Sequence, residues 1–575
     1  MKKILALVLA LAMILMVGAS FADTNNLTAD TTVSITNLDQ GDVVTLYKII
    51  KWDGAWKVVD GYTGLTQDEV NDIVKQNDVT GAAINNAAGW TDAYINKVIT
   101  STLPTPVALG DAATVGASKT FTATVEPGMY YALVTPKDGT KIYKPMFVSA
   151  DYSSTSTTTT VAAKSETVTL DKESISQTND QDSDKTYTHS ADSDNTVGVG
   201  DVVEFTLTTT IPNFPASFTN PIFKVSDSLS HLELVVKSDA KDIRVYSPSY
   251  DATNLVAATN YTLTSDSATA FEVAFTKDFI QANGGKQVVV VYTATVKNDG
   301  TNIIDNHDNT AKVNFSNNPD DEVGANEVED HTEHYSFTIN GDVWTEKDST
   351  DIVKVGINAD GTEITQDVVL PNSHYVGALQ GAQFTLYTNN AAGTGPSEDV
   401  YRSDITSGAD GRFTISDLDA GIYWLVETQA PAGYVKQSAP VKIEIIPTFA
   451  THTVAAQTKT VQYDQDDSSK TVQVTVPAYS YPELVSYKIL IDGSETASYS
   501  FKNDEIDERH DDKIGETVSG GDEDADNDDL GKVKNPKGTE LPSTGGIGTT
   551  IFYIVGGILL IGAAVILVAR RKAHD

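Results

Sequence analysis

The sequence of 575 residues contains no cysteine, few basic residues relative to its acidic ones, and little helical periodicity. Exported small domains usually rely on disulfide bonds, so without cysteine another device must secure them, or their cores must suffice alone. With 40 Lys and Arg against 79 Asp and Glu, the formal net charge is -39. This charge excludes nucleic acid as a natural partner, because binding phosphates requires a positive surface. The sequence also shows no catalytic triad, P-loop or dinucleotide-binding fingerprint, so nothing in it supports an enzyme.

The N-terminal end has the pattern of an export signal. Lys2 and Lys3 precede an apolar stretch at residues 4–17, and the small residues Ser20 and Ala22 follow it. This order predicts a secretory signal peptide at residues 1–22. The mature chain is therefore expected to be secreted, and its acidity is that of a solvated surface outside the cell.

The C-terminal end has the pattern of a membrane anchor. An uncharged apolar run at residues 551–569 has about the length of a bilayer-spanning helix, roughly 20 residues. The basic cluster at residues 570–572 follows it and predicts that the tail stays on the cytoplasmic side. Directly before the span stand Leu541, Pro542, Ser543, Thr544 and Gly545.

This order of LPxTG motif, apolar span and basic tail resembles the cell-wall sorting signal of Gram-positive surface proteins. The resemblance implies that a sortase cleaves between Thr544 and Gly545, so that the transmembrane helix is temporary and the protein ends at the cell surface. The alternative is an exposed turn ahead of an ordinary C-terminal anchor.

Between the two ends, short segments rich in Val, Ile, Thr, Tyr and Phe alternate with Gly, Asp, Asn and Pro clusters. This pattern predicts an all-β protein of tandem immunoglobulin-like β-sandwiches. One helical patch is expected at residues 66–75 and 91–100, with Thr66 and Thr91 as N-caps. The expected domains are an N-terminal sandwich at 23–163, a second at 164–335, a third at 336–540 with an insertion after Pro447, and the sorting segment at 541–575.

Three polar residues of the second domain continue the apolar, inward side of their strands. Lys172 follows Val168 and Leu170, Asp227 follows Phe223 and Val225, and Asn309 precedes Ala311 and Val313 at period two. Burial lowers the pKa of a lysine and raises that of an aspartate, and a neutral amine is a nucleophile. A protonated Asp227 could then catalyse an amide between Lys172 and Asn309, with loss of ammonia. The alternative is a hydrogen-bonded trio or an ordinary ion pair.

This layout resembles the isopeptide-forming fimbrial domain related to the A-type domain of collagen adhesins. The resemblance rests on three phrases: Asp227-Ser228-Leu229, Asn309-Thr310-Ala311, and the segment TIPNFP at 210–215. It implies the same roles for Lys172, Asp227 and Asn309.

Three blocks of the third domain, at residues 381–387, 417–423 and 427–434, resemble the B-type domain of collagen adhesins and sortase-assembled pilins. The resemblance implies that Glu427 is catalytic and that Lys354 and Asn535 form the crosslink, with Asn503 as a rival acceptor. The first domain echoes two of these phrases, at 44–47 and 128–134. Val134 stands there in place of Glu427, and no opening lysine is present, so no crosslink is expected in that domain.

Polymerisation requires an exposed amine that captures the Thr544 acyl group of the next subunit. In sortase-assembled major pilins this amine belongs to a lysine at the end of the first domain, which implies Lys164 here. The surrounding residues lack the Trp and Tyr-Pro of that family's motif, so the position alone supports Lys164. Lys144 is the competitor, and an ordinary surface lysine is the alternative.

The expected function is a major pilin, crosslinked within two domains, polymerised by a sortase and attached to peptidoglycan, with no cofactor. Its partners are sortase, identical subunits and peptidoglycan, and further partners are minor pilins and ligands on host or neighbouring cells. A non-polymerising LPxTG adhesin or minor pilin is the first alternative, and a secreted hydrolase is the second. His331, Glu333 and His334 are too short a phrase for a zinc site. The acidic run at 522–529 is interpreted as a solvated linker, so no metal is expected.

Overall fold

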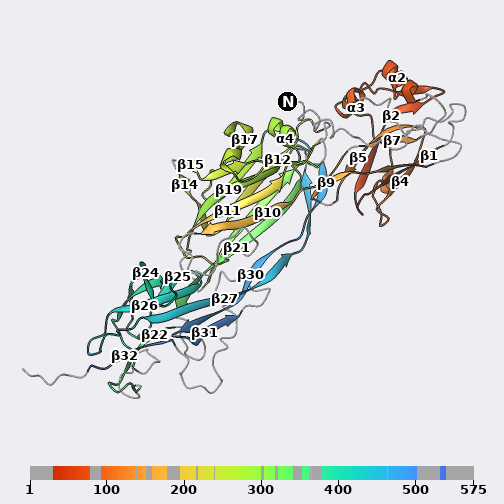
Figure 1. The fold of residues 1–575 in the computed structure, drawn as a ribbon. Helices are drawn as coiled ribbons and strands as arrows, with labels where there is room; N and C mark the ends of the chain where they lie inside the picture. Colours follow the sequence, from red (N-terminus) through yellow and green to blue (C-terminus); the bar gives the residue numbers. More distant parts are fainter. Residues whose placement is uncertain are drawn as a thin grey trace, which may run out of the picture. The chain divides into compact units, whose positions relative to one another are not determined.

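The computed structural model describes residues 30–77, 92–137, 139–144, 146–150, 158–177, 195–214, 218–237, 240–298, 304–317, 321–340, 352–362, 364, 377–462, 464–500 and 531–538. Strands dominate this part of the chain, which confirms the predicted all-β fold class (Figure 1). None of its helices is long and apolar enough to cross a membrane. The predicted signal peptide, the motif at 541–545, the apolar span, the acidic run and Asn503 lie outside the described residues.

The chain forms two compact units. The first contains the N-terminal part up to Ser336 together with Phe449–Leu484, and the second contains Phe337–Thr448 and the part from Val485 onward. The domain boundaries expected from the sequence stay predictions.

The N-terminal sandwich of the first unit has two sheets. One has the order β4-β1-β8, in which β1 pairs antiparallel with β4 and parallel with β8, and the other has the order β3-β2-β5-β7. Their inward side chains, among them Val33, Leu46 and Phe121, form one apolar cluster. The strands are β1 (Thr31–Thr36), β2 (Val43–Trp52), β3 (Trp56–Val58), β4 (Phe121–Val125), β5 (Gly128–Thr135), β7 (Met146–Ala150) and β8 (Thr158–Ala162).

Two helices cover a second apolar cluster on the sheet of β2 and β5. α2 (Gln67–Asn77) and α3 (Asp92–Ile99) contribute Val70 and Val98 to it, and a short 3-10 turn, η3 (Gly110–Ala113), precedes β4. The start of α2 is a capping box: the Thr66 hydroxyl accepts from the Glu69 backbone N–H at 3.3 Å, and Glu69 accepts from the Thr66 N–H at 2.8 Å. This confirms Thr66 as the predicted N-cap, whereas Thr91 lies outside the described residues.

The second sandwich encloses a large core between two sheets. One sheet has the order β10-β11-β19-β13 with β16 also paired to β19, and the other runs β17-β18-β12-β20-β21. The strands are β10 (Leu170–Gln177), β11 (Val202–Thr210), β12 (Phe223–Leu229), β13 (Leu232–Leu234), β16 (Ile243–Tyr246), β17 (Tyr261–Thr264), β18 (Ala270–Phe275), β19 (Gln287–Val296), β20 (Ile304–Phe315) and β21 (Asn326–Asn340).

Smaller elements complete this sandwich. The minor strands pair as β14 (Val236–Lys237) with β15 (Ala240–Lys241), and β6 (Lys141–Tyr143) with β9 (Ser165–Thr167). The 3-10 turns η4 (Ala252–Asn254) and η5 (Ala258–Asn260) precede β17. Helix α4 (Lys277–Asn283) begins at Thr276, whose hydroxyl caps Phe279 N–H, and it was not expected from the sequence.

The second unit is built on a six-stranded sheet and a separate strand pair. The sheet order is β24-β23-β26-β27-β30-β31, and β22 pairs in parallel with β32. β25 pairs with the last residues of β21, from Phe337 to Asn340. The strands are β22 (Val353–Ile357), β23 (Gln383–Asn389), β24 (Pro396–Thr406), β25 (Thr414–Leu418), β26 (Gly421–Gln429), β27 (Val441–Val454), β30 (Tyr479–Ile491), β31 (Ser494–Ser500) and β32 (Lys532–Pro536).

The insertion after Pro447, whose structure the sequence left open, is a β-ribbon. β27 and β30 continue beyond the second unit, and β28 (Gln457–Gln462) pairs with β29 (Thr471–Val476) as a hairpin. Within the first unit, Lys459 Nζ donates to Glu327 at 2.6 Å and to Glu329 at 3.0 Å. The ribbon is thereby tied to β21 of the second sandwich.

Candidate crosslinking sites

The strand registers of the second sandwich bring Lys172, Asp227 and Asn309 into one buried site. Lys172 stands on β10 opposite Leu207 of the same sheet. Asp227 on β12 is paired with Ala311 of β20, and Leu229 is paired with Asn309, so both polar residues come from adjacent strands of the facing sheet. The Lys172 and Asp227 side chains are wholly buried, and so is Asn309. The alternation of the strands thus buries all three residues, as the sequence pattern predicted.

A tyrosine hydroxyl lies at the centre of this site. Lys172 Nζ is 2.6 Å from Asp227 Oδ2 and donates to the Tyr292 hydroxyl at 3.2 Å. That hydroxyl donates to Asp227 Oδ2 at 2.7 Å and accepts from Asn309 Nδ2 at 2.6 Å. Tyr292 on β19 therefore contacts all three members of the trio, and its role was not predicted from the sequence. The only signal in the sequence was a tyrosine in an apolar strand, whose buried hydroxyl must find a partner.

Burial acts in opposite directions on the two ionisable partners. It lowers the pKa of the Lys172 amine, and the negative charge of Asp227 opposes this only in part. It raises the pKa of Asp227, against the opposing charge of Lys172. Both shifts favour a neutral amine beside a protonated carboxyl. The rings of Phe205 and Tyr292, with centroids 5.6 and 5.8 Å from Nζ, line the site and exclude water.

Two acceptor oxygens in this site lack a hydrogen-bond donor among the described residues. Asp227 Oδ1 and Asn309 Oδ1 are both buried and have no hydrogen-bond partner among the described residues. A buried acceptor without a donor costs about 1–3 kcal/mol. A protonated Asp227 carboxyl carries the hydrogen that such an acceptor requires.

The second site lies in the second unit, where the parallel pair β22 and β32 faces β26. In the register of this pair, Lys354 stands opposite Val533 and Gly356 opposite Asn535. Lys354 and Asn535 are fully buried, and Glu427 on β26 is 3% exposed. Lys354, Glu427 and Asn535, named separately from the sequence, are thus neighbours in the structure.

The contacts in this site are direct. Lys354 Nζ donates to Asn535 Oδ1 and lies 3.2 Å from Glu427 Oε1. Asn535 Nδ2 donates to both Glu427 oxygens, at 2.9 and 3.0 Å, and the Gln437 backbone N–H holds Oε2 at 2.7 Å. Burial lowers the pKa of Lys354 to about 8, against the opposing charge of Glu427. The amine is therefore much closer to its nucleophilic form than a surface lysine is.

The two sites share one geometric feature. In each, the carboxamide nitrogen, which would leave as ammonia, donates to a group that can carry a proton: the Tyr292 hydroxyl in one and the Glu427 carboxylate in the other. In the N-terminal sandwich, the position that corresponds to Glu427 is Val134, which is buried on β5 among apolar side chains.

The two candidate lysines for polymerisation differ in their surroundings. Lys164 is exposed in the link between β8 and β9, and its backbone carbonyl accepts from Lys144 N–H at 2.8 Å. The Lys144 amine is half-buried and lies 3.0 Å from Glu166 Oε1. The chain therefore presents Lys164 more openly than Lys144.

Two family models match the chain. Residues 372–460 match SpaA, a prealbumin-like fold domain, and residues 533–575 match the LPXTG cell wall anchor motif. The chain carries a SpaA-type domain and an LPXTG cell-wall anchor. These matches confirm the predicted resemblance to sortase-assembled Gram-positive pilins and the predicted location at the cell wall.

Several solved structures of pilins are similar to the chain. The T6 backbone pilin of serotype M6 Streptococcus pyogenes shares 17% identity with a TM-score of 0.48, over 80% of this chain and 96% of that one. The major pilin SpaD from Corynebacterium diphtheriae shares 16% identity with a TM-score of 0.41, over 72% and 90%. BcpA, the major pilin subunit of Bacillus cereus, shares 15% identity with a TM-score of 0.36, over 72% and 95%. No curated protein matches the chain.

Proposed function

We propose that this protein is the backbone subunit of a covalent pilus, polymerised by a sortase, attached to peptidoglycan and stabilised by two amide crosslinks that it forms itself. The observation that carries the proposal is the pair of buried lysine, acid and asparagine trios, one in each unit. Burying an amine, a carboxyl and a carboxamide together is costly unless they react or fully satisfy one another. A cysteine-free exported chain that contains this arrangement twice has a replacement for disulfides.

The reaction at each trio is a transfer of the asparagine acyl group from ammonia to lysine. In the second sandwich, the neutral Lys172 Nζ attacks Cγ of Asn309 and forms a carbon–nitrogen bond, while protonated Asp227 polarises the carboxamide oxygen. One proton of Nζ passes to the departing Nδ2, the bond from Cγ to Nδ2 breaks, and ammonia leaves. Lys172 and Asn309 end as a secondary amide, and Asp227 is regenerated.

Tyr292 has a proton-relay role in this reaction. Its hydroxyl contacts both the Asp227 carboxyl and the Asn309 nitrogen, at 2.7 and 2.6 Å. It can therefore pass a proton from the acid to the leaving nitrogen. Among the described residues, Asp227 makes no direct hydrogen bond to the Asn309 nitrogen. In the second unit, Glu427 contacts the Asn535 nitrogen itself, so that site requires no such relay.

Polymerisation uses the two ends of the subunit. A sortase cysteine would hold the Thr544 carbonyl as a thioester after Gly545 leaves, and the Lys164 amine of another subunit would attack it. An amide forms and the sortase thiol is released. Because this joins the head of one subunit to the tail of the next without closing, the product is a fibre. Minor pilins and ligands on host or neighbouring cells are further partners of such a fibre.

The experiment that tests the crosslinks is intact-mass measurement of the exported chain. The wild-type protein should be lighter than its calculated mass by two ammonia molecules. Asp227→Ala and Glu427→Ala should each restore one of them, and peptide mapping should find the joined pairs Lys172–Asn309 and Lys354–Asn535. A wild-type protein that retains both ammonia molecules refutes the crosslinks.

Polymerisation is tested separately, in cells that carry the sortase. Boiled cell-wall extracts should show a ladder above the monomer mass, which Lys164→Ala removes and Lys144→Ala leaves in place. A single wall-linked band in the wild type would instead indicate a non-polymerising adhesin or a minor pilin.

A further inference from the structure

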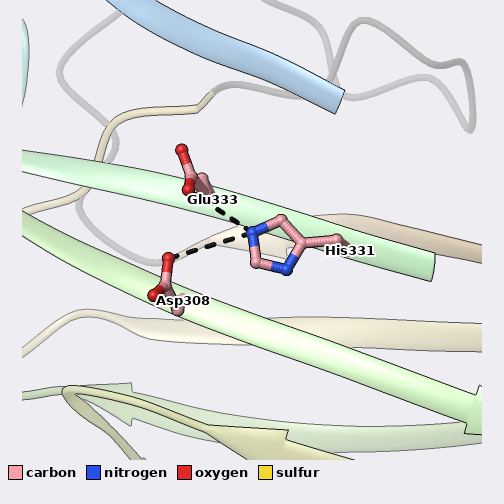
Figure 2. Close-up of side chains that lie close together, drawn as sticks. All are labelled: Asp308, His331 and Glu333. Atoms are coloured by element: carbon pink, nitrogen blue, oxygen red, sulfur yellow. Dashed lines mark ion pairs between the residues drawn. The ribbon is translucent and has the colours of Figure 1, made fainter. Parts of the chain in front are cut away.

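Three side chains of the second sandwich, outside the crosslinking site, converge on one point. Asp308 on β20 meets His331 and Glu333 on the neighbouring strand β21 (Figure 2). His331 Nε2 lies 3.4 Å from Glu333 Oε1 and 3.8 Å from Asp308 Oδ1. The residues 331 and 333 share a face of β21 because successive side chains of a strand alternate.

This cluster differs from the one that the sequence phrase suggested. His334 is three residues from His331 and therefore points to the opposite face, where its ring packs edge-on against Phe205 at 5.6 Å. The third ligand is instead Asp308, which only the pairing of β20 with β21 brings into place. The phrase at 331–334 was too short to predict a metal site, and the fold adds Asp308 as a further ligand.

The imidazole of His331 is oriented for a cation. Its side chain is 9% exposed, and Nε2 is buried with no hydrogen-bond partner among the described residues. Nδ1 lies 3.0 Å from the Thr310 hydroxyl, which can accept its proton. In that tautomer the Nε2 lone pair points between two carboxylates, an arrangement that is repulsive without a positive species. The distances of 3.4 and 3.8 Å are longer than a good N–H···O hydrogen bond, so a proton on Nε2 satisfies neither oxygen well.

We propose that Asp308, His331 and Glu333 bind a first-row divalent metal ion of the zinc type. Nitrogen and oxygen ligands lie roughly 2.0–2.2 Å from zinc, and two such atoms at a tetrahedral angle are about 3.4 Å apart. The His331 and Glu333 atoms have this separation, 3.4 Å. Asp308 is 45% exposed, which gives the ion an entry path and leaves the fourth position to water.

Groups behind the ligands hold this geometry. The Tyr335 hydroxyl donates to Glu333 Oε2, and Asn306 Nδ2 lies 3.4 Å from Oε1. The Tyr481 ring, whose centroid is 4.4 Å from that of His331, covers the imidazole. Such support fixes ring orientation and ligand basicity in metal sites. The proposal is independent of the crosslinks, because none of these three side chains belongs to either trio.

The test is zinc binding by the purified full chain in detergent, measured by competition with a chromophoric zinc chelator after removal of metals. The wild type should bind one equivalent of zinc saturably. His331→Ala should weaken binding by more than about 100-fold, beyond the 10- to 100-fold typical of changes to groups behind the ligands. Asp308→Asn, at a half-exposed position that leaves packing intact, should also weaken binding.

Asp278→Asn is the matched control. Asp278 is an exposed acid of the same sandwich, in the first turn of α4, and it belongs to no group of possible metal ligands among the described residues. Its substitution should leave zinc affinity unchanged. Absence of saturable binding, binding that survives both His331→Ala and Asp308→Asn, or loss of binding in Asp278→Asn would each overturn the proposal.

Discussion

A double substitution in the second unit separates a covalent crosslink from a buried ion pair. Lys354→Met/Glu427→Gln removes the amine and the acid together and leaves side chains of similar volume. If the wild type has only an ion pair, replacing it by neutral or apolar groups should be neutral or stabilising, by up to about 1–4 kcal/mol. If the wild type has an amide between Lys354 and Asn535, the same variant loses a covalent loop closure and should be less stable.

The size of that loss follows from the positions of the joined residues. Lys354 and Asn535 are 181 positions apart in the chain. The chain-entropy relation for a crosslink that closes a loop of this length gives about 5 kcal/mol. For a folded unit of this size, 1 kcal/mol corresponds to roughly 2–4 °C in Tm. The double variant is therefore expected to melt about 10–20 °C below the wild type.

Differential scanning calorimetry of the exported chain, with intact mass on the same samples, measures both quantities. Glu427→Gln alone should retain one ammonia and lose at least as much stability, because it also leaves Lys354 buried beside an uncharged partner. A double variant that melts at or above the wild-type temperature would refute the crosslink in this unit, as would a wild type whose mass shows no ammonia lost there.

Three further predictions concern the reaction and the assembly. Tyr292→Phe should slow ammonia loss in the second sandwich without abolishing it, because Lys172 and Asp227 remain in contact at 2.6 Å. Mass spectrometry at successive times after cell-free synthesis measures the rate of ammonia loss, and an unchanged rate contradicts the relay. The pKa of Lys354 is lowered to about 8, so the neutral fraction of its amine should rise about tenfold between roughly pH 7 and 9. The rate of ammonia loss in the second unit should rise with it, and a rate that falls over this interval contradicts the amine as nucleophile. Lys164→Arg keeps the positive charge but should abolish the polymer ladder, and a surviving ladder would assign the bond to another lysine.

The strand alternation made much of the site predictable. Lys172, Asp227 and Asn309 break an apolar face at period two, and a polar residue on such a face is either paired or reactive, so their burial followed from the pattern alone. The pattern could not reveal the role of Tyr292, because a tyrosine that follows a run of valines on β19 is predicted to be an ordinary buried core residue. Only the facing of the two sheets shows that its hydroxyl meets all three residues.

In the second unit, too, the sequence pattern alone could not show which residues meet. The phrase around Glu427 and the strand ahead of the sorting motif indicated the residues, yet which asparagine meets Lys354 depends on strand order. The parallel pairing of β22 with β32 places Asn535 there. The proposed metal site was missed for a similar reason. Asp308 and His331 lie on the neighbouring strands β20 and β21, and no local sequence pattern predicts that these two strands pair. The destination of the inserted ribbon, with Lys459 on Glu327 and Glu329, was likewise not encoded locally.

The positions of the proposed crosslinks along the chain have a mechanical consequence at the C-terminal end. In a fibre joined through Thr544, each subunit would be pulled at that residue, and Asn535 is the last buried asparagine before it among the described residues. With Asn535 joined to Lys354, tension entering from Thr544 passes through the amide directly to β22. Residues 355–534, which include the six-stranded sheet and the ribbon, are then bypassed by the load.

The same reasoning applies at the other end, where tension leaves through Lys164. Lys172 is the first buried lysine after it in the chain, and its amide to Asn309 would bypass residues 173–308. The covalent load path would then consist of the two amides and the chain segments 164–172, 309–354 and 535–544. The middle segment includes β21, which therefore stays under load. If Lys164 and Thr544 are the attachment points, non-covalent packing has to hold β21 under tension but not the bypassed strands. Two amides would then give a chain without cysteine most of the tensile strength that a fibre subunit requires.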